Sequence, residues 1–186
     1  SGANIDLKKD FILVIYHPVT TELATLVEKT KTVLSTVRSL GVPAIWFWPN
    51  FDAGGEGVAQ ELRRFREETH GHAIKFMRQL PPQHFLYLLK KARCLVGNSS
   101  AGIKECSFLG IPVVNIGTRQ QDRLRAKNVL DVTHNEKVIR NAIQKQISVG
   151  RYKSSRLYFK PGTSKNIARV LATSLLYVQK RFVTSA

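Results

Sequence analysis

The sequence predicts an α/β domain in which helices cover both faces of a parallel sheet of about six strands. Short apolar runs alternate with longer amphipathic stretches, and glycine and proline cluster between them. No apolar run approaches the roughly 20 residues needed to cross a bilayer. The chain has 186 residues, 43% of them hydrophobic, which suits one sizeable core. We therefore predict one domain over residues 1–186, with about residues 1–8 as a tag or linker.

The first half of the chain is expected to hold three strands, at residues 11–16, 42–48 and about 72–76. A helix is expected from about residue 22 to residue 40, where Gly41 ends it. The segment 49–55 is rich in turn-forming residues, and the apolar positions after it recur at helical spacing. Each strand is therefore followed by a loop and a helix.

The second half continues the alternation, with strands expected at residues 93–96, 111–116 and 128–132. Helices are expected from Pro82, over 99–109 with Gly110 as the end, over 136–149 and over 164–179. Six short strands that alternate with helices are typical of a doubly wound, Rossmann-like domain of three layers. Such sheets bind their ligands at the carboxyl ends of the strands.

Cysteine usage bears on the compartment of the protein. Cys94 and Cys106 are too few for a disulfide framework and lack the paired spacing of a zinc site, so we expect two buried, small hydrophobic residues. The first residues do not resemble a secretory signal, because no apolar stretch follows a basic one. We expect a cytoplasmic setting, no membrane span, no metal and no cofactor.

The formal net charge of +16 and an isoelectric point near 10.3 favour anionic partners. Lysines and arginines are dispersed over the chain, however, and no zinc-finger, homeodomain or RNP signature accompanies them. We therefore expect a basic surface with one anion pocket and no nucleic-acid binding. A basic module for nucleic acid or anionic surfaces stays open as an alternative function.

Residues 97–102, Gly-Asn-Ser-Ser-Ala-Gly, follow a buried strand and begin a predicted helix. Small side chains and unpaired N–H groups at a helix N-terminus attract phosphate, which predicts an anion site. The alternative is a plain helix cap by Asn98 or Ser99, with Gly102 needed only for packing. The spacing matches neither the dinucleotide-binding nor the P-loop pattern, so both interpretations stay open.

Other polar groups stand at or near the strand ends. Glu105 is suited to accept the hydroxyls of a ribose, or it is an ordinary solvated glutamate. Arg119 and Arg123 follow the fifth strand and suit phosphate, or they belong to a basic surface loop. His17 precedes Pro18 at the end of the first strand, where a histidine can serve as an acid, a base or a phosphate donor. Structural roles are expected for the other histidines and the tryptophans, namely His70, His72, His84, His134, Trp46 and Trp48.

Several segments carry a pattern in common with a known family. They are His17-Pro-Val-Thr-Thr-Glu22, Pro49-Asn-Phe-Asp-Ala-Gly54, residues 97–105, residues 110–120 and Asn128-Val129. In order and spacing they resemble the C-terminal domain of the hydrolysing UDP-N-acetylglucosamine 2-epimerases. The resemblance is to the branch that makes N-acetylmannosamine for sialic acids and related nonulosonic acids, and it covers nearly the whole chain.

The resemblance implies a glycosyltransferase-B architecture, in which substrate lies between two Rossmann-like halves. This chain would be the C-terminal, UDP-sugar-binding half, and UDP or UDP-N-acetylglucosamine, the missing N-terminal half and a second copy in a homodimer would be its partners. The implied roles are diphosphate binding by Ser99, Ser100 and Gly102, ribose binding by Glu105, phosphate or cleft contact by Arg119, nucleotide contact by Asn50 and catalysis by His17. His17 would take part in the elimination of UDP, giving a glycal that gains water to yield N-acetylmannosamine.

The chain also departs from the family. Asp122 stands where a glycine is usual and Leu124 follows Arg123, which puts the conformation of this loop in question. The proton-transfer carboxylates of the family belong to the other half, so we expect the chain alone to be inactive. A donor-nucleotide domain of a glycosyltransferase-B glycosyltransferase is the alternative from the same architecture.

Overall fold

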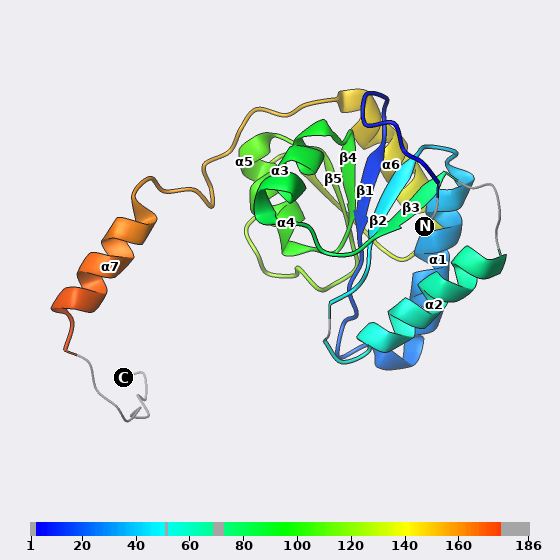
Figure 1. The fold of residues 1–186 in the computed structure, drawn as a ribbon, viewed down its shortest axis with the longest axis horizontal. Coiled ribbons are helices and arrows are strands. Elements are labelled where there is room, and N and C mark those ends of the chain that lie inside the picture. The colour runs from blue at the N-terminus through cyan, green and yellow to red at the C-terminus, as the bar shows by residue number, and fades with distance from the viewer. Residues whose placement is uncertain (1–2, 51, 69–72, 176–186) are drawn as a thin grey trace.

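Six parallel strands form one sheet in the order β3-β2-β1-β4-β5-β6 (Figure 1). The computed structural model describes residues 3–50, 52–68 and 73–175. The strands are β1 (Ile12–Ile15), β2 (Ala44–Phe47), β3 (Ile74–Met77), β4 (Cys94–Gly97), β5 (Val113–Ile116) and β6 (Val129–Val132). The chain order reverses between β1 and β4, which lie side by side in the middle of the sheet. The carboxyl ends on both sides of this switch are where an open α/β sheet binds ligands.

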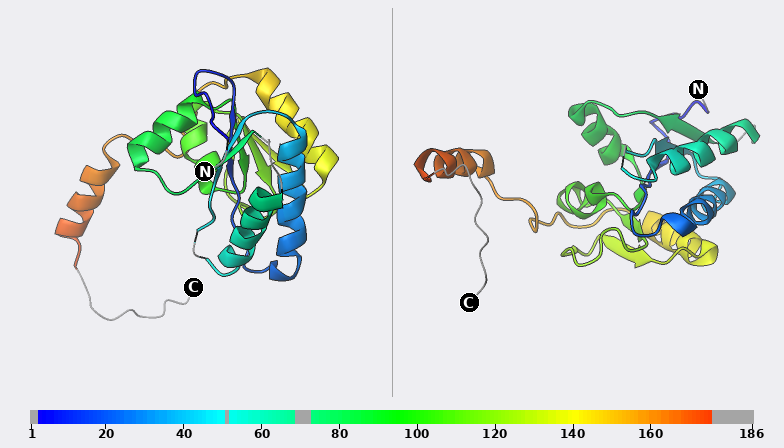
Figure 2. Two further views of the ribbon diagram at one scale, coloured as in Figure 1. Left: turned by 45° about the vertical axis from the view of Figure 1, so that its right-hand side comes forward. Right: turned by 90° about the horizontal axis from the view of Figure 1, so that it is seen from below.

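Helices cover the sheet on both faces, which makes three layers (Figures 1 and 2). One face carries α1 (Leu26–Ser39), α2 (Gly55–Glu68) and α6 (Glu136–Val149). The other carries α3 (Pro82–Lys91), α4 (Ser100–Ile103) and α5 (Glu105–Leu109). A short 3-10 helix, Leu23–Thr25, leads into α1, and α7 (Thr163–Thr173) follows the last of the covering helices. The predicted fold class is confirmed.

The core consists of the two faces of the sheet and the helices upon them. Strands β1, β2, β4 and β5 are buried along their whole length, as expected for parallel strands with helices on both sides. Trp46 is fully buried and Trp48 packs against the same cluster, so the expected structural role of this pair agrees with the structure. Cys94 and Cys106 are both buried and free, and burial raises the pKa of each thiol.

Two of the predicted helices differ from those observed. The helix expected over 99–109 is divided at Lys104, whose φ of −97° and ψ of −73° stay in the right-handed helical region but depart from regular helix values. The Ser107 hydroxyl donates to the Ile103 carbonyl at 2.6 Å, a back-bond of the kind that bends helices. The last helix ends at Thr173 because Ser174 is extended, and residues 176–179 lie outside the described residues.

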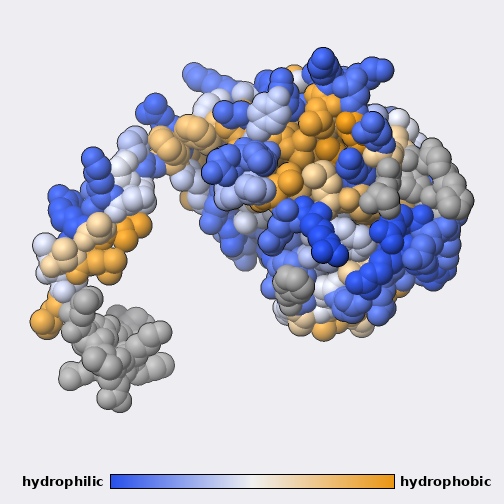
Figure 3. Space-filling model, viewed as in Figure 1, coloured by the Kyte–Doolittle hydropathy of each residue, from blue (hydrophilic) through white to orange (hydrophobic). Residues whose placement is uncertain are grey.

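The chain leaves the body after α6 as an extended strap of residues 151–162. Its Tyr152 and Ser155 amides donate to the carbonyls of Gly110 and Ser107 at 2.8 and 2.9 Å, so the strap begins docked on the body. Helix α7 then stands apart from the body in all views (Figures 1 and 2). Its apolar side is exposed at the surface (Figure 3). None of its residues is buried. Helix α7 therefore adds little to the stability of the body.

Leu171→Ala in α7 is expected to change the free energy of unfolding by no more than about 0.5 kcal/mol, because Leu171 is 57% exposed. The matched change Leu89→Ala in α3 removes a fully buried side chain and should cost about 2–5 kcal/mol. Urea denaturation of both variants measures the difference. A large loss from Leu171→Ala would show that α7 packs on the body in solution.

The N-terminal segment lies beside the edge of the sheet. The Ala3 amide donates to the Ile74 carbonyl at 3.4 Å, and Ile5 packs against the cluster beneath α3. These residues were expected to be a tag or linker, and in the structure they contact the body. Among the described helices, none is long and apolar enough to cross a membrane.

Candidate functional site at the carboxyl ends of the strands

The register of the sheet brings the predicted site segments to one edge. Ile15 pairs with both Phe47 and Gly97, and Gly97 pairs with Asn115. The loops after β1, β2, β4 and β5 therefore begin side by side, and they carry His17, Asn50, residues 98–100 and Arg119. The rule that ligands bind at strand ends places the candidate site here.

Gly97 permits the close approach of two of these loops. Its φ is +130°, and a Cβ at this position would lie 2.0 Å from the carbonyl oxygen of Ile15. The same carbonyl accepts the Asn98 amide at 3.1 Å, so the pairing of β1 with β4 continues into the loops. Any side chain at residue 97 would separate these loops.

Asn98 uses both ends of its amide on the backbone of His17. Its Oδ1 accepts the His17 N–H at 2.8 Å, and its Nδ2 donates to the His17 carbonyl at 2.8 Å. Asn98 was considered as a helix cap, and the structure gives that role to Ser99 instead, whose hydroxyl accepts the Ala101 amide at 3.3 Å. The contact of Asn98 with the His17 backbone was not predicted from the sequence.

A closed network joins five residues from four loops. The backbone N–H of Asn50 donates to Nδ1 of His17 at 3.3 Å, and the side-chain Nδ2 of Asn50 donates to the Asp52 carboxylate at 2.5 Å. Arg119 reaches Asp52 at 3.5 Å and the Asn98 carbonyl at 3.3 Å. We call His17, Asn50, Asp52, Asn98 and Arg119 the strand-end network. It holds three of the predicted site residues together with Asp52 and Asn98, which lay within the segments that resemble the family but had no predicted role in the site.

The pKa of His17 is lowered to about 4, chiefly by burial and also by the charge of Arg119, while the Asp52 carboxylate acts in the opposite direction. The imidazole is therefore neutral near pH 7. Because Nδ1 accepts the Asn50 amide, the proton of the neutral imidazole resides on Nε2. His17 can then donate a hydrogen bond from Nε2 to an anion bound at the strand ends.

An NMR titration of the imidazole protons should give His17 a midpoint near pH 4, and His17→Gln assigns the signal. In the unfolded state the His17 imidazole takes up a proton near pH 6.5, whereas in the folded state it does so only near pH 4. The contribution of His17 to stability is therefore present above pH 6.5 and is lost as the pH falls towards about 4, because protons bind the unfolded state first. The free energy of unfolding should fall less steeply over this window in His17→Gln. A His17 midpoint at its ordinary value would contradict the buried, cationic surroundings.

The start of α4 leaves hydrogen-bond donors free at the edge of the network. Within the described residues, the backbone N–H groups of Ser99 and Ser100 donate to no protein acceptor. Because α4 has only four residues, a macrodipole adds little here, and these N–H groups and Arg119 are the donors available to an anion at this end of the sheet. Gly102 is buried, and a Cβ there would lie 2.8 Å from Val113, which supports its packing role.

Glu105 begins α5 beyond the bend at Lys104 and is exposed. It makes no hydrogen bond or ion pair with the described residues, so its carboxylate is free to accept hydroxyl groups from a ligand. The division of the predicted helix places Glu105 in the first turn of a second helix. It therefore lies outside the strand-end network, one turn further along the chain.

The loop after β5 is fixed by hydrogen bonds that the sequence did not indicate. Gln120 is buried and donates to the Asn98 carbonyl at 2.8 Å, while Arg125 pairs with Asp131 at 2.6 Å. Asp122 has a φ of +62°. Aspartate tolerates this left-handed conformation, so the loop adopts it here without a glycine.

A second group of contacts joins the loops after β1 and β5. Glu22 accepts the Thr118 hydroxyl at 2.6 Å and pairs with Lys29 at 2.8 Å, and these hydrogen bonds lower the pKa of its carboxyl group. The buried Tyr16 hydroxyl lies 2.8 Å from Nε2 of His134. His134 thus has the structural role expected of it. His70 and His72 lie outside the described residues.

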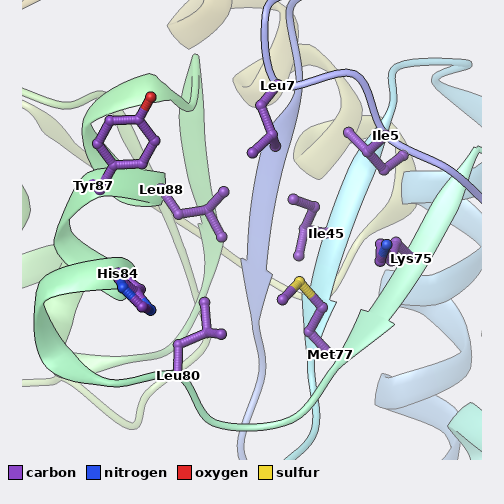
Figure 4. Close-up of a pocket in the computed structure, with 9 residues that line it drawn as sticks. All are labelled: Ile5, Leu7, Ile45, Lys75, Met77, Leu80, His84, Tyr87 and Leu88. Atoms are coloured by element: carbon purple, nitrogen blue, oxygen red, sulfur yellow. The ribbon is translucent and has the colours of Figure 1, made fainter.

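A separate hollow of about 250 Å³ lies between α3, the N-terminal segment and the β2–β3 edge (Figure 4). Its lining is mainly aliphatic, with Lys75, His84 and Tyr87 as its polar members. None of the strand-end network contributes to it, and an aliphatic lining does not suit a diphosphate. Within the described ranges, no three His, Cys, Asp or Glu side chains gather in a way that could hold a metal ion.

Residues 2–172 match the family model described as UDP-N-acetylglucosamine 2-epimerase. A UDP-N-acetylglucosamine 2-epimerase of Neisseria meningitidis serogroup B is 32% identical over 177 residues, which covers 91% of this chain and 45% of the relative. The GDP/UDP-N,N'-diacetylbacillosamine 2-epimerase (hydrolyzing) of Campylobacter jejuni is 34% identical over 131 residues, 70% of this chain and 34% of the relative. The chain spans less than half the length of these relatives.

Solved structures agree on the fold. The UDP-GlcNAc 2-epimerase of Methanocaldococcus jannaschii, solved with UDP-GlcNAc and UDP, superposes with a TM-score of 0.71 and 15% identity, over 89% of this chain and 46% of that one. A glycosyltransferase involved in avilamycin A biosynthesis, AviGT4, gives 0.51 and 13%, over 89% and 53%. The domain thus corresponds to about half of each of these structures.

Proposed function

Because the chain belongs to the UDP-N-acetylglucosamine 2-epimerase family, we propose that it is the C-terminal half of a hydrolysing member and binds the UDP group of a UDP-sugar. The observation that carries the proposal is the strand-end network, which gathers Arg119 and the neutral His17 at the strand ends around Asn98. Ser99 and Ser100 follow Asn98 directly in the chain, and their N–H groups have no acceptor among the described residues. These are hydrogen-bond donors from neighbouring loops at the switch point of the sheet. A diphosphate supplies the acceptors that they lack.

Each predicted residue takes a role in this proposal. Arg119 and the first turn of α4 bind the diphosphate, and Nε2 of His17 donates to it. Glu105 accepts the ribose hydroxyls, and Asn50 contacts the nucleotide from the loop after β2. Gly102 contributes by bringing α4 close to β5. Asp52 holds Arg119 and Asn50 in place.

The reaction divides between two halves. A base removes the C2 proton of the sugar, the C1–O bond breaks, and UDP leaves to give a glycal. Water then adds at C1 and a proton returns to C2 from the opposite face, which yields N-acetylmannosamine or the corresponding diacetamido sugar. His17 stabilises the departing UDP. We assign the base to the N-terminal half, because Asp52, the one carboxylate in the strand-end network, is held by Arg119 and Asn50.

Isothermal titration calorimetry with UDP tests this proposal. The chain should bind UDP, and Ser100→Ala and Glu105→Ala should each weaken binding. The first removes a hydroxyl donor beside the free N–H groups, and the second removes the ribose contact. Glu136→Ala is the matched control, since Glu136 is also an acid in the first turn of a helix but lies on α6. The proposal is wrong if UDP does not bind, or if the three variants bind it equally well.

Activity tests the division between the halves. The chain alone should release no UDP from UDP-N-acetylglucosamine, whereas a protein containing both halves should release UDP and N-acetylmannosamine. The superposition on a glycosyltransferase keeps a glycosyltransferase donor domain as the second candidate. Transfer of the sugar to an acceptor by the two-half protein, without free N-acetylmannosamine, would favour that candidate. The homodimer and the cytoplasmic location remain predictions.

A further inference from the structure

Asn98 is the point at which the loops after β1, β4 and β5 meet. Its side chain is fully buried and binds both backbone polar groups of His17, each at 2.8 Å. Its carbonyl oxygen accepts from Gln120 at 2.8 Å and from Arg119 at 3.3 Å. We infer that Asn98 is the positioning residue of the site, whose side chain fixes His17 and whose carbonyl fixes Arg119.

The chemistry of the side chain suits this role. An N–H and a C=O of the same residue need an acceptor and a donor together, and a primary amide supplies both. The N–H and C=O of His17 also fix which end of the Asn98 side-chain amide is the oxygen. These two hydrogen bonds restrain the peptide planes before and after His17. The imidazole is therefore held where its Nδ1 accepts the Asn50 amide.

The carbonyl of Asn98 completes the arrangement. The Asn98 amide remains bonded to Ile15, and the φ of +130° at Gly97 turns the chain at this point. Arg119 is held here by a neutral acceptor and by one loose contact with Asp52 at 3.5 Å. A guanidinium has five N–H donors, so most of them stay available to an anion. Arg119 is thus oriented without being neutralised.

Asn128 serves as a control for Asn98, because it is a buried and hydrogen-bonded asparagine that lies away from the site. Asn128 is also buried, donates from Nδ2 to the Ile111 carbonyl at 2.8 Å and accepts the Ser107 hydroxyl at 3.1 Å. It bonds the end of α5 to the start of β5 and touches none of the strand-end network. Asn98→Ala and Asn128→Ala should therefore cost comparable stability, while only Asn98→Ala changes the site.

The experiment measures the His17 titration by NMR without ligand, and UDP affinity by calorimetry. In Asn98→Ala we expect the His17 midpoint to rise from about 4 towards 6.5, because the imidazole leaves its buried place. We expect the UDP dissociation constant to rise at least about tenfold, or about 1.4 kcal/mol. Asn128→Ala should change neither. Unchanged values in Asn98→Ala, or equal changes in both variants, overturn the inference.

The measurement of UDP affinity rests on the proposed function, whereas the NMR titration of His17 does not. If the wild-type chain fails to bind UDP, the proposed function fails and the titration alone decides the role of Asn98. If Asn98→Ala does not fold, amide exchange in the wild type decides it. The His17 amide should exchange at least about a hundredfold more slowly than the exposed Thr20 amide, which has no acceptor among the described residues. Equal exchange would contradict the inference.

Discussion

Gly97→Ala is expected to lower the free energy of unfolding by at least about 3 kcal/mol and to abolish UDP binding. A Cβ would lie 2.0 Å from the carbonyl oxygen of Ile15, which belongs to a central strand and has no space to move. The φ of +130° adds backbone strain for any other residue. Relief of the contact must separate β1 from β4, and this moves His17 away from Asn98.

Urea denaturation and UDP calorimetry measure the two effects of this change. Gly57→Ala in α2 is the matched control, because its nearest contact would be an ordinary 3.7 Å from Leu26 and its φ is not positive. Alanine there should stabilise the helix by about 0.5–1 kcal/mol. If Gly97→Ala were as stable as the wild type, the close approach of the two central strands would not exist in solution.

Arg119→Ala should weaken UDP binding by about ten- to a hundredfold, the loss of about 1.5–3 kcal/mol that follows removal of a charged hydrogen-bond donor. Arg119→Lys keeps the charge but loses the planar fork, so its affinity should lie between those of Arg119→Ala and the wild type. The loss should shrink as salt is added. Calorimetry at two salt concentrations measures both effects.

Arg140→Ala provides the control for charge alone, since Arg140 lies on α6 and pairs with Glu136 at 2.8 Å. Its removal subtracts the same charge from a chain of net charge +16. If both variants weakened UDP binding equally, the general positive field of the protein would explain binding. A specific phosphate contact by Arg119 would then be wrong.

The fold could be predicted because hydrophobic periodicity and turn residues act locally. The run at 11–16 contains β1, and Gly110, in the left-handed conformation, ends α5 as expected. The division at Lys104 could not be predicted, because it accompanies a hydrogen bond between the Ser107 side chain and the Ile103 backbone. The detachment of α7 was equally hidden, since its apolar spacing is the same as that of a helix packed on the body.

The site could be predicted only in part, for a related reason. The rule of strand ends brought His17, Asn50 and Arg119 to one edge, and the structure joins them in one network. The roles of Asn98 and Asp52 were missed because Asn98 bonds to His17 and Asp52 pairs with Arg119, which lie on other loops, at positions that no spacing within one segment reveals. Asp52 lies within the segment 49–54 that resembles the family, and this was the available signal.

The most direct test of the account is an NMR titration of the isotope-labelled chain with UDP, followed residue by residue. We predict that the largest shifts occur at His17, Ser99, Ser100 and Arg119, while the residues of the hollow, such as Ile5 and Leu88, do not respond. Absence of shifts at millimolar UDP, or shifts confined to the hollow, would contradict a UDP site at the carboxyl ends of the strands.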